Sequence, residues 1–167
     1  MDEVGSIINL FGVTRVHEMQ RLAVEETRLK IPLMIGLDVL HGYKTIFPVP
    51  LGEAALFDPD AWEQTATEAA KEAAADGINL TFAPMLDISR DPRWGRSAEG
   101  PGEDPWLASS FARAKVKGFQ GGDLAAAEAI ARPHPGRRGA DVGDRPAAHA
   151  LCADVKVRHK KISGLKV

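Results

Sequence analysis

The stretch PLMIGLDVL at residues 32–40 decides the fold class of this chain. It is apolar throughout except for Asp38, which stands close to its end. A short unbroken apolar run is typical of a strand that is buried on both faces in a parallel sheet. We therefore predict a buried strand with a single carboxylate near its carboxyl end.

Two further, mostly apolar runs lie on either side of this stretch along the chain. Residues 4–10 (VGSIINL) end close to Gly12, and residues 78–86 (INLTFAPML) lead into a long polar loop. Each run predicts another buried strand. Pro84 is an objection to the later strand, because proline cannot donate a ladder hydrogen bond, and a position near the strand end removes that objection.

Helical patterns fill the segments between these runs. Apolar residues recur at helical spacing before Pro32 and predict an amphipathic helix: Val16, Met19, Leu22, Ala23 and Leu29. A second helix opens with Asp58 as its N-cap, Pro59 as its first residue and Asp60 in its first turn, and it ends at Gly77. Its inward face is expected to consist of small residues: Ala66, Ala69, Ala70, Ala73 and Ala74.

A third helix is predicted over residues 106–118, after the polar loop. Strand and helix therefore alternate three times along the chain. This alternation is typical of an α/β protein with a parallel sheet.

The composition, with 44% hydrophobic and 26% charged residues, is that of a globular protein. Cys152 is the single cysteine, which excludes an internal disulfide and a zinc site built from cysteines. The net charge of -2 gives no general case for binding nucleic acid. No stretch reaches the roughly 18 apolar residues that cross a bilayer, and the acidic start is unlike a secretory signal. The sequence indicates neither a compartment nor an oligomeric state.

The charge balance changes abruptly near residue 131. Residues 131–167 contain nine Lys/Arg and three Asp, whereas residues 1–130 contain 12 basic and 20 acidic side chains. The later segment is rich in Arg, Pro, Gly and Ala and has neither helical nor strand periodicity. We predict a folded part at residues 1–130 and a disordered tail at residues 131–167. The alternative is a natural basic tail that binds a polyanion.

Two places are candidates for a functional site, because functional groups gather at the carboxyl ends of parallel strands. The first is Asp38, in the stretch DVLHG at residues 38–42. A carboxylate at the end of an apolar strand is costly to bury without donors, and it can accept two sugar hydroxyl hydrogen bonds. The equal alternative is that Asp38 caps a loop or pairs with a nearby arginine.

The second place is the loop at residues 89–105 (SRDPRWGRSAEGPGEDP), which contains three Arg, two Asp, two Glu and Trp94. Arginine forks match carboxylates or vicinal hydroxyls, and the tryptophan offers a flat apolar face. The alternative is a loop that pairs with itself through Arg–carboxylate bridges. No spacing of His, Cys and carboxylates fits a metal site, so no metal or cofactor is predicted.

Together these stretches resemble the N-terminal barrel domain of glycoside hydrolase family 3, a family of β-glucosidases, β-xylosidases and related exo-acting enzymes. The order and spacing of five stretches carry the resemblance: residues 28–33 (RLKIPL), 38–42 (DVLHG), 47–48 (FP), 83–96 (APMLDISRDPRWGR) and 99–105 (EGPGEDP). The run RDPRWGR is long and unusual, so the match is specific. The resemblance implies about the first three βα units of a (β/α)8 TIM-type barrel.

The resemblance also implies roles for individual residues. In the family, the Asp of the DxxHG motif holds hydroxyls of the nonreducing-end sugar, which is carried over to Asp38. The last Arg of the WGR motif lines the same sugar site, which is carried over to Arg96, with Glu99 as an orienting partner. Arg93 is expected to be structural. The implied reaction is retaining, exo-acting hydrolysis of a β-linked glucoside or related saccharide.

The catalytic residues themselves are not expected in this chain. The family continues with a strand carrying a Lys-His pair that binds the same sugar, then a Ser-Asp strand with the nucleophile, and a later segment with the acid/base. Near Ile130, where the fourth strand is expected, the sequence becomes the basic tail, and we infer a frameshift or an erroneous gene model. We therefore expect a β-glucosidase-like fragment that is inactive alone, marginally stable and prone to associate.

Two other functions stay open. One is a non-catalytic module that binds carbohydrate through the Asp38 and Arg96 loops and a polyanion through the tail. Salt-sensitive heparin binding that disappears without residues 131–167 would favour it. The other is a different barrel enzyme with a phosphate-bearing substrate, whose phosphate loop is expected near a late strand.

Overall fold

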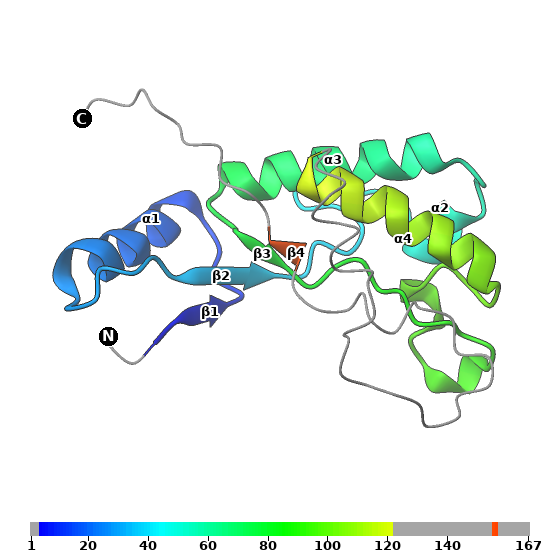
Figure 1. Ribbon diagram of the computed structural model, residues 1–167, viewed down its shortest axis with the longest axis horizontal. Coiled ribbons are helices and arrows are strands. Elements are labelled where there is room, and N and C mark those ends of the chain that lie inside the picture. The colour runs from blue at the N-terminus through cyan, green and yellow to red at the C-terminus, as the bar shows by residue number, and fades with distance from the viewer. Residues whose placement is uncertain (1–3, 122–154, 157–167) are drawn as a thin grey trace, which may run out of the picture.

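The computed structural model describes residues 4–121 and 155–156 (Figure 1). Three strands follow one another in chain order across a short sheet: β1 (Ser6–Ile8), β2 (Met34–Leu37) and β3 (Leu80–Thr81). β1 pairs with β2, and β2 pairs with β3, in both cases in parallel. The predicted α/β organisation with a parallel sheet is therefore confirmed. Pro84 lies beyond β3 and removes no ladder hydrogen bond.

A fourth strand, β4 (Val155–Lys156), lies beside β3 and runs in the opposite direction. A (β/α)8 barrel contains only parallel strands, so β4 does not take the place of a fourth barrel strand. β4 is the part of residues 131–167 that the structure describes. The predicted disorder of the rest of this tail falls outside the described residues.

β1 is less buried than its sequence predicts. Ile7 packs against the core, but Ile8 keeps 60% of its surface exposed. Ser6 and Ile8 point to the face opposite to Ile7, and the described residues leave that face exposed. The prediction of a first strand buried on both faces is therefore wrong, whereas β2 is buried from Ile35 to Leu37.

α1 (Val13–Arg21) continues into a short π-helical turn, η1 (Leu22–Glu26). The chain leaves this turn at Thr27, whose hydroxyl donates a hydrogen bond of 2.6 Å to the carbonyl oxygen of Ala23. One of the last acceptors of the helix is thereby satisfied. The predicted helix is confirmed, but Leu29 lies beyond its end and is 48% exposed.

α3 (Pro59–Ala75) begins and ends where the sequence predicts. The carboxylate of Asp58 accepts hydrogen bonds from two first-turn N–H groups, at 3.0 and 3.2 Å. Gly77 follows the helix with φ of +86°, a conformation that glycine adopts without strain. Four of the five alanines predicted to face inward are buried: Ala66, Ala69, Ala70 and Ala73.

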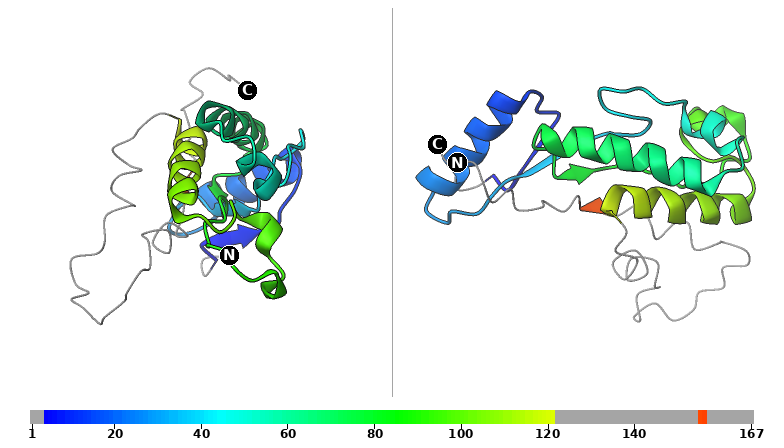
Figure 2. Two further views of the ribbon diagram at one scale, coloured as in Figure 1. Left: turned by 90° about the vertical axis from the view of Figure 1, so that its right-hand side faces the viewer. Right: turned by 90° about the horizontal axis from the view of Figure 1, so that it is seen from above.

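α4 (Pro105–Gln120) lies side by side with α3 (Figure 2). The five-residue α2 (Pro50–Ala54) contacts both helices through Glu53, which is hydrogen-bonded to Trp62 of α3 and Lys115 of α4. Asp104 caps α4 by accepting a first-turn N–H at 2.6 Å. Gly118 permits the close contact of the two long helices, because a Cβ there would collide with the carbonyl oxygen of Glu63. α2 was not predicted, since five residues are too few to show a helical period.

Two buried apolar clusters join these elements. The first lies between the sheet, α1, α3 and the end of α4. The second lies between α2, α3 and α4: Ala54, Trp62, Leu86, Phe111, Ala112 and Ala114. Leu86 belongs to this second cluster, so the residue just before the polar loop is held in the core.

Some apolar surface is left uncovered. Phe57 and Trp106 are 71% and 85% exposed, and Met34 of β2 is 48% exposed. In the described part of the chain, every helix is too short or too polar to cross a membrane.

Two side-chain amides extend the hydrogen bonding of the sheet. Asn79, just before β3, accepts the Ile35 N–H through Oδ1 at 2.7 Å and donates through Nδ2 to the Leu33 carbonyl at 3.0 Å. Gln20 of α1 accepts the Leu33 N–H at 2.9 Å and donates to its carbonyl at 2.8 Å. The peptide groups of Leu33 and Ile35 therefore have hydrogen-bond partners although β3 does not extend far enough to pair with them.

Replacing Asn79 with Leu is expected to lower the free energy of unfolding by about 2 kcal/mol, because the Ile35 N–H loses its partner inside the protein. The exposed Gln64 of α3 offers a matched control, and Gln64→Leu is expected to change stability by less than about 0.5 kcal/mol. Urea unfolding measures both variants. Equal effects of the two substitutions would contradict the role assigned to Asn79.

Candidate functional site

Asp38 follows β2 directly, at the carboxyl end of the sheet. Its neighbours Leu37 and Val39 are buried, whereas Asp38 itself is exposed. Because β2 and β3 are parallel, the segment that follows β3 emerges at the same end of the sheet. Asp38 and the loop at residues 89–105, the two places selected from the sequence, therefore both follow the carboxyl end of the sheet.

The loop after Asp38 turns back on itself and is closed by His41. The ring Nδ1 lies 3.0 Å from the Phe47 carbonyl oxygen, which can only accept, so Nδ1 carries a proton. The Phe47 N–H donates in return to the His41 carbonyl at 2.8 Å. Gly42 has φ of +117°, and a Cβ there would collide with the carbonyl oxygen of Thr45. The His-Gly pair of the DVLHG stretch thus fixes the loop shape.

Two carboxylates of α3 and its C-cap hold the other side of this loop. Glu72 accepts the backbone N–H groups of Lys44 and Thr45 at 2.9 and 2.8 Å. Asp76 is 6% exposed and accepts the Tyr43 hydroxyl and Lys44 Nζ, both at 2.8 Å. The hydrogen bond from Lys44 is the main cause that lowers the pKa of Asp76, and burial opposes it. The loop is therefore tied to α3 by charged hydrogen bonds.

Tyr43 is the single tyrosine of the chain, so tyrosinate absorbance reports on it alone. Burial, followed by the hydrogen bond to Asp76, raises the pKa of Tyr43 to about 12. In the unfolded chain the pKa of tyrosine is about 10. The stability contributed by the protonated Tyr43 hydroxyl is therefore fully present below about pH 10 and is lost as the pH rises through about 12.

The Asp76→Asn variant is expected to shift the Tyr43 midpoint downward but not fully to about 10, because burial remains as a cause. Absorbance titration with circular dichroism in parallel measures the ionisation and verifies that the chain stays folded. A midpoint near 10 in the folded, unsubstituted chain would contradict this anchoring of the loop.

Arg96 and Glu99 form a two-point ion pair in the loop after β3. Arg96 Nε donates to both carboxylate oxygens at 3.0 and 3.2 Å, and Nη2 donates at 2.6 Å. Glu99 ends the 3-10 turn η3 (Ser97–Glu99), and the Arg96 and Glu99 side chains are 56% and 34% exposed. The bonds from Arg96 lower the pKa of Glu99. The pair is held in one orientation yet stays open to a ligand.

Two further carboxylates act on Arg96. The hydrogen bonds to Glu99 are the main cause that raises the pKa of Arg96, burial opposes them, and the charges of Glu99, Asp87 and Asp38 add to the increase. Asp38 directly follows β2, Asp87 lies in the segment after β3, Arg96 precedes η3 and Glu99 ends it. We call Asp38, Asp87, Arg96 and Glu99 the Arg96 cluster.

Arg93 is engaged elsewhere in the loop. Its Nε donates to both oxygens of Asp91 at 3.0 Å, and its Nη2 donates at 2.5 Å. The pair lies at the 3-10 turn η2 (Pro92–Trp94), and the Arg93 side chain is 88% exposed. Both arginines are thus bridged to carboxylates of their own loop, as the self-paired alternative predicts.

The loop is also held by contacts of its two ends. Ser89 and Ser97 share a hydrogen bond of 2.5 Å between their hydroxyls, and the Ser89 N–H donates to the Gly102 carbonyl at 3.1 Å. A Cβ on Gly100 would lie 3.0 Å from the Asp87 carbonyl oxygen. The segment after Asp87 and the segment around η3 are therefore closely packed.

Of the residues selected from the sequence, Arg96 and Glu99 are in direct contact, the charge of Asp38 acts on Arg96, and Arg93 pairs with Asp91 instead. Asp87 was not selected, although it directly follows the run at residues 78–86, and Asp38 stands close to the end of another such run. The same rule could have found it. Across the described ranges, no group of His, Cys, Asp or Glu side chains is arranged to hold a metal ion.

Comparison with known proteins identifies relatives of this chain. The glycosyl hydrolase family 3 N terminal domain matches residues 2–132. A periplasmic β-glucosidase from Salmonella typhimurium is 47% identical over 119 residues, which are 71% of this chain and 16% of that protein. A lysosomal β-glucosidase from Dictyostelium discoideum is 39% identical over 113 residues, or 65% of this chain and 14% of that protein.

Solved structures agree with these relatives. A β-glucosidase from Listeria innocua in complex with isofagomine superposes with a TM-score of 0.70 at 44% identity, over 72% of this chain and 17% of that chain. A β-N-acetylhexosaminidase from Beutenbergia cavernae superposes with a TM-score of 0.59 at 25% identity, over 69% of this chain and 40% of that chain. This chain thus spans a small share of the length of the enzymes it matches. By sequence and by fold, it belongs to glycosyl hydrolase family 3, within the N-terminal domain of that family.

Proposed function

We propose that residues 1–130 are the first three βα units of a family 3 (β/α)8 barrel and that residues 131–167 are a separate tail. The parallel order of β1, β2 and β3, with α1, α3 and α4 after them, supports this assignment. The antiparallel pairing of β4 supports a boundary before it, because such a strand does not continue a barrel.

The function that fits this fragment is to hold the nonreducing-end sugar of a β-linked glucoside. The observation that supports it is that Asp38 follows the carboxyl end of β2 and that its charge, with that of Asp87, acts on the Arg96–Glu99 pair. Asp38 is exposed and offers acceptors for two sugar hydroxyls, while Arg96 offers donors. Glu99 orients Arg96 through its two-point contact.

The whole protein is, in this proposal, a retaining exo-acting glycoside hydrolase that resembles β-glucosidases. The Listeria innocua β-glucosidase has been solved with glucose and, as a mutant, with laminaribiose. A β-linked glucoside is accordingly the substrate that we assign to the intact enzyme.

The chain by itself is expected to hydrolyse nothing. A retaining mechanism needs a nucleophilic carboxylate and a protonated carboxylic acid on either side of the glycosidic bond. Arg96 lowers the pKa of Glu99 and keeps it ionised, which is the opposite of what a general acid requires. Glucose release from an aryl β-glucoside by the purified, monodisperse chain, well above background, would overturn this expectation.

Binding of isofagomine, followed by isothermal titration or ligand-observed NMR, tests the sugar site directly. Arg96→Lys and Asp38→Asn are each expected to weaken binding by about tenfold, because a hydrogen bond to a charged group is lost. Arg93→Lys is the matched control, since Arg93 makes the same kind of ion pair outside the cluster. Equal losses for Arg93→Lys and Arg96→Lys would contradict the assignment.

The charge of the tail favours one alternative, a non-catalytic fragment that binds carbohydrate or a polyanion. Nine Lys/Arg against three Asp in residues 131–167 provide the positive charge that polyanion binding requires. Heparin binding that weakens steeply with salt and disappears when the tail is deleted would favour this alternative.

A further inference from the structure

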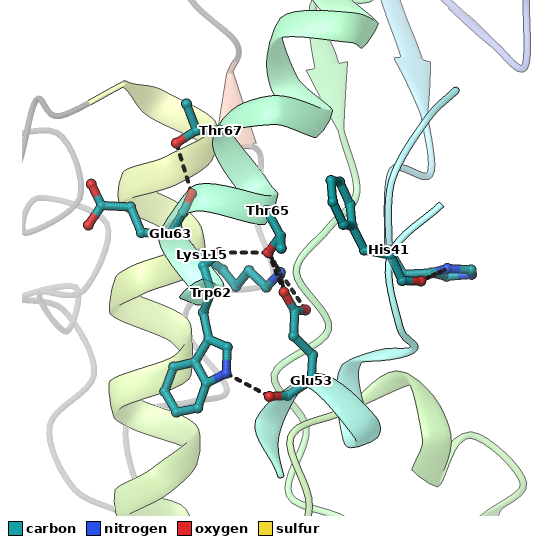
Figure 3. Close-up of polar contacts among 8 residues, drawn as sticks. His41, Glu53, Trp62, Glu63, Thr65, Thr67 and Lys115 are labelled. Atoms are coloured by element: carbon teal, nitrogen blue, oxygen red, sulfur yellow. Dashed lines mark hydrogen bonds and ion pairs between the residues drawn. The ribbon is translucent and has the colours of Figure 1, made fainter. Parts of the chain in front are cut away.

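A buried ion pair, together with a threonine hydroxyl, joins three helices. Lys115 Nζ of α4 lies 2.6 and 2.5 Å from the two carboxylate oxygens of Glu53 in α2. Thr65 of α3 hydrogen-bonds to the same carboxylate and to Lys115, the latter at 2.8 Å. Figure 3 shows the three side chains pointing toward one another. The Lys115 and Glu53 side chains are 5% and 1% exposed, so water does not compete for these contacts.

The pair fixes α2, which cannot be stable by itself. A helix of five residues has too few internal hydrogen bonds to offset the cost of ordering its backbone. Trp62 of α3 supplies a further bond, because its Nε1 donates to the backbone carbonyl of Glu53 at 2.7 Å. The position of α2 is therefore set by α3 and α4.

α2 in turn packs against the turn that carries Glu99. η3 contacts α2, and the space that a Cβ on Gly102 would occupy lies 3.7 Å from Leu51 Cδ1 of α2. The Gly102 carbonyl accepts the Ser89 N–H, and Ser89 is bonded to Ser97 at the start of η3. A chain of direct contacts thus leads from the buried pair to Arg96 and Glu99.

We propose that Glu53 and Lys115 are positioning residues of the sugar site: their ion pair sets α2, and α2 sets the orientation of Arg96 and Glu99. The functional meaning of this inference rests on the proposed role of Arg96 in sugar binding. Its test needs no sugar, so its outcome is independent of that role.

The probe is the proton–nitrogen correlation spectrum of the arginine Nε–H groups in the full chain. Arg96 and Arg93 each donate Nε–H to both oxygens of a carboxylate, so both signals are expected to exchange slowly with water. Arg96→Lys and Arg93→Lys assign the two signals. Arg93 is an internal control, because its partner Asp91 belongs to the same loop but the contacts traced from α2 lead to η3.

Lys115→Met and Glu53→Gln are each expected to raise the exchange rate of the Arg96 signal by about tenfold, the factor for loss of a hydrogen bond between charged groups. The Arg93 signal is expected to stay unchanged. The double variant Glu53→Leu/Lys115→Met, which fills the space with apolar side chains, is expected to restore slow exchange. Thr65→Val, which removes one hydroxyl at constant size, is expected to shift Arg96 in the same direction but less.

Slow Arg96 exchange in both folded single variants would overturn the proposal. Parallel loss of the Arg93 and Arg96 signals would also overturn it, because it would indicate general destabilisation instead of positioning. If the single variants do not fold, Thr65→Val decides: an unchanged Arg96 signal refutes the proposal, and a selective change supports it.

Discussion

Replacing Lys115 with Met is expected to lower the free energy of unfolding by about 3–5 kcal/mol, one of the two largest effects predicted for this chain. The substitution leaves the carboxylate of Glu53 inside the protein without its counter-ion. Glu53 is 1% exposed, and its Oε2 is held only by the charge of Lys115 Nζ at 2.5 Å. Urea unfolding followed by circular dichroism measures the loss as a shift of the midpoint.

The double variant Glu53→Leu/Lys115→Met separates the cost of an unpaired charge from the value of the pair. Burial lowers the pKa of Lys115 more than Glu53 raises it, so attraction offsets only part of the desolvation. The double variant is therefore expected to unfold within about 1 kcal/mol of the unsubstituted chain, or to be more stable. A double variant as unstable as Lys115→Met would show that the pair itself contributes net stability.

Sequence patterns predict those parts of the fold that depend on local interactions. The ends of α3 follow from Asp58 and Gly77, since an N-cap and a left-handed residue act within one turn. The length of β3 does not follow in this way. The run at residues 78–86 is apolar except for Asn79 and Thr81, yet only Leu80 and Thr81 pair with β2, because ladder length depends on the partner strand.

The same distinction between local and long-range interactions applies to the candidate site. The contact of Arg96 with Glu99 joins residues three positions apart, and such contacts can be predicted from spacing. The action of the Asp38 charge on Arg96 joins segments that follow different strands. The resemblance to a family implies a shared site for these two residues, whereas periodicity does not. The ion pair of Glu53 with Lys115 joins residues 62 positions apart on helices of unrelated pattern. No local signal predicts such a pair.

Replacing Trp62 with Ala is expected to lower the free energy of unfolding by about 3–5 kcal/mol, because it opens a cavity between α2, α3 and α4. Trp62 is 1% exposed, and its ring lies 5.2 Å from that of Phe111 between centroids. The substitution also removes the indole donor from the Glu53 carbonyl. Urea unfolding gives the loss, and a value below about 2 kcal/mol would contradict the packing of this cluster.

The control Trp62→Phe keeps an aromatic ring next to Phe111 and removes the indole donor, so a smaller loss of about 1–2 kcal/mol is expected. Its combination with Lys115→Met tests whether the two side chains act through Glu53. Both contact that residue, one at its backbone carbonyl and the other at its carboxylate. Their effects are therefore expected to deviate from additivity by at least about 0.5 kcal/mol. Strict additivity would mean that α2 is held by two independent contacts, and then loss of the ion pair alone would leave α2, and with it η3, in place.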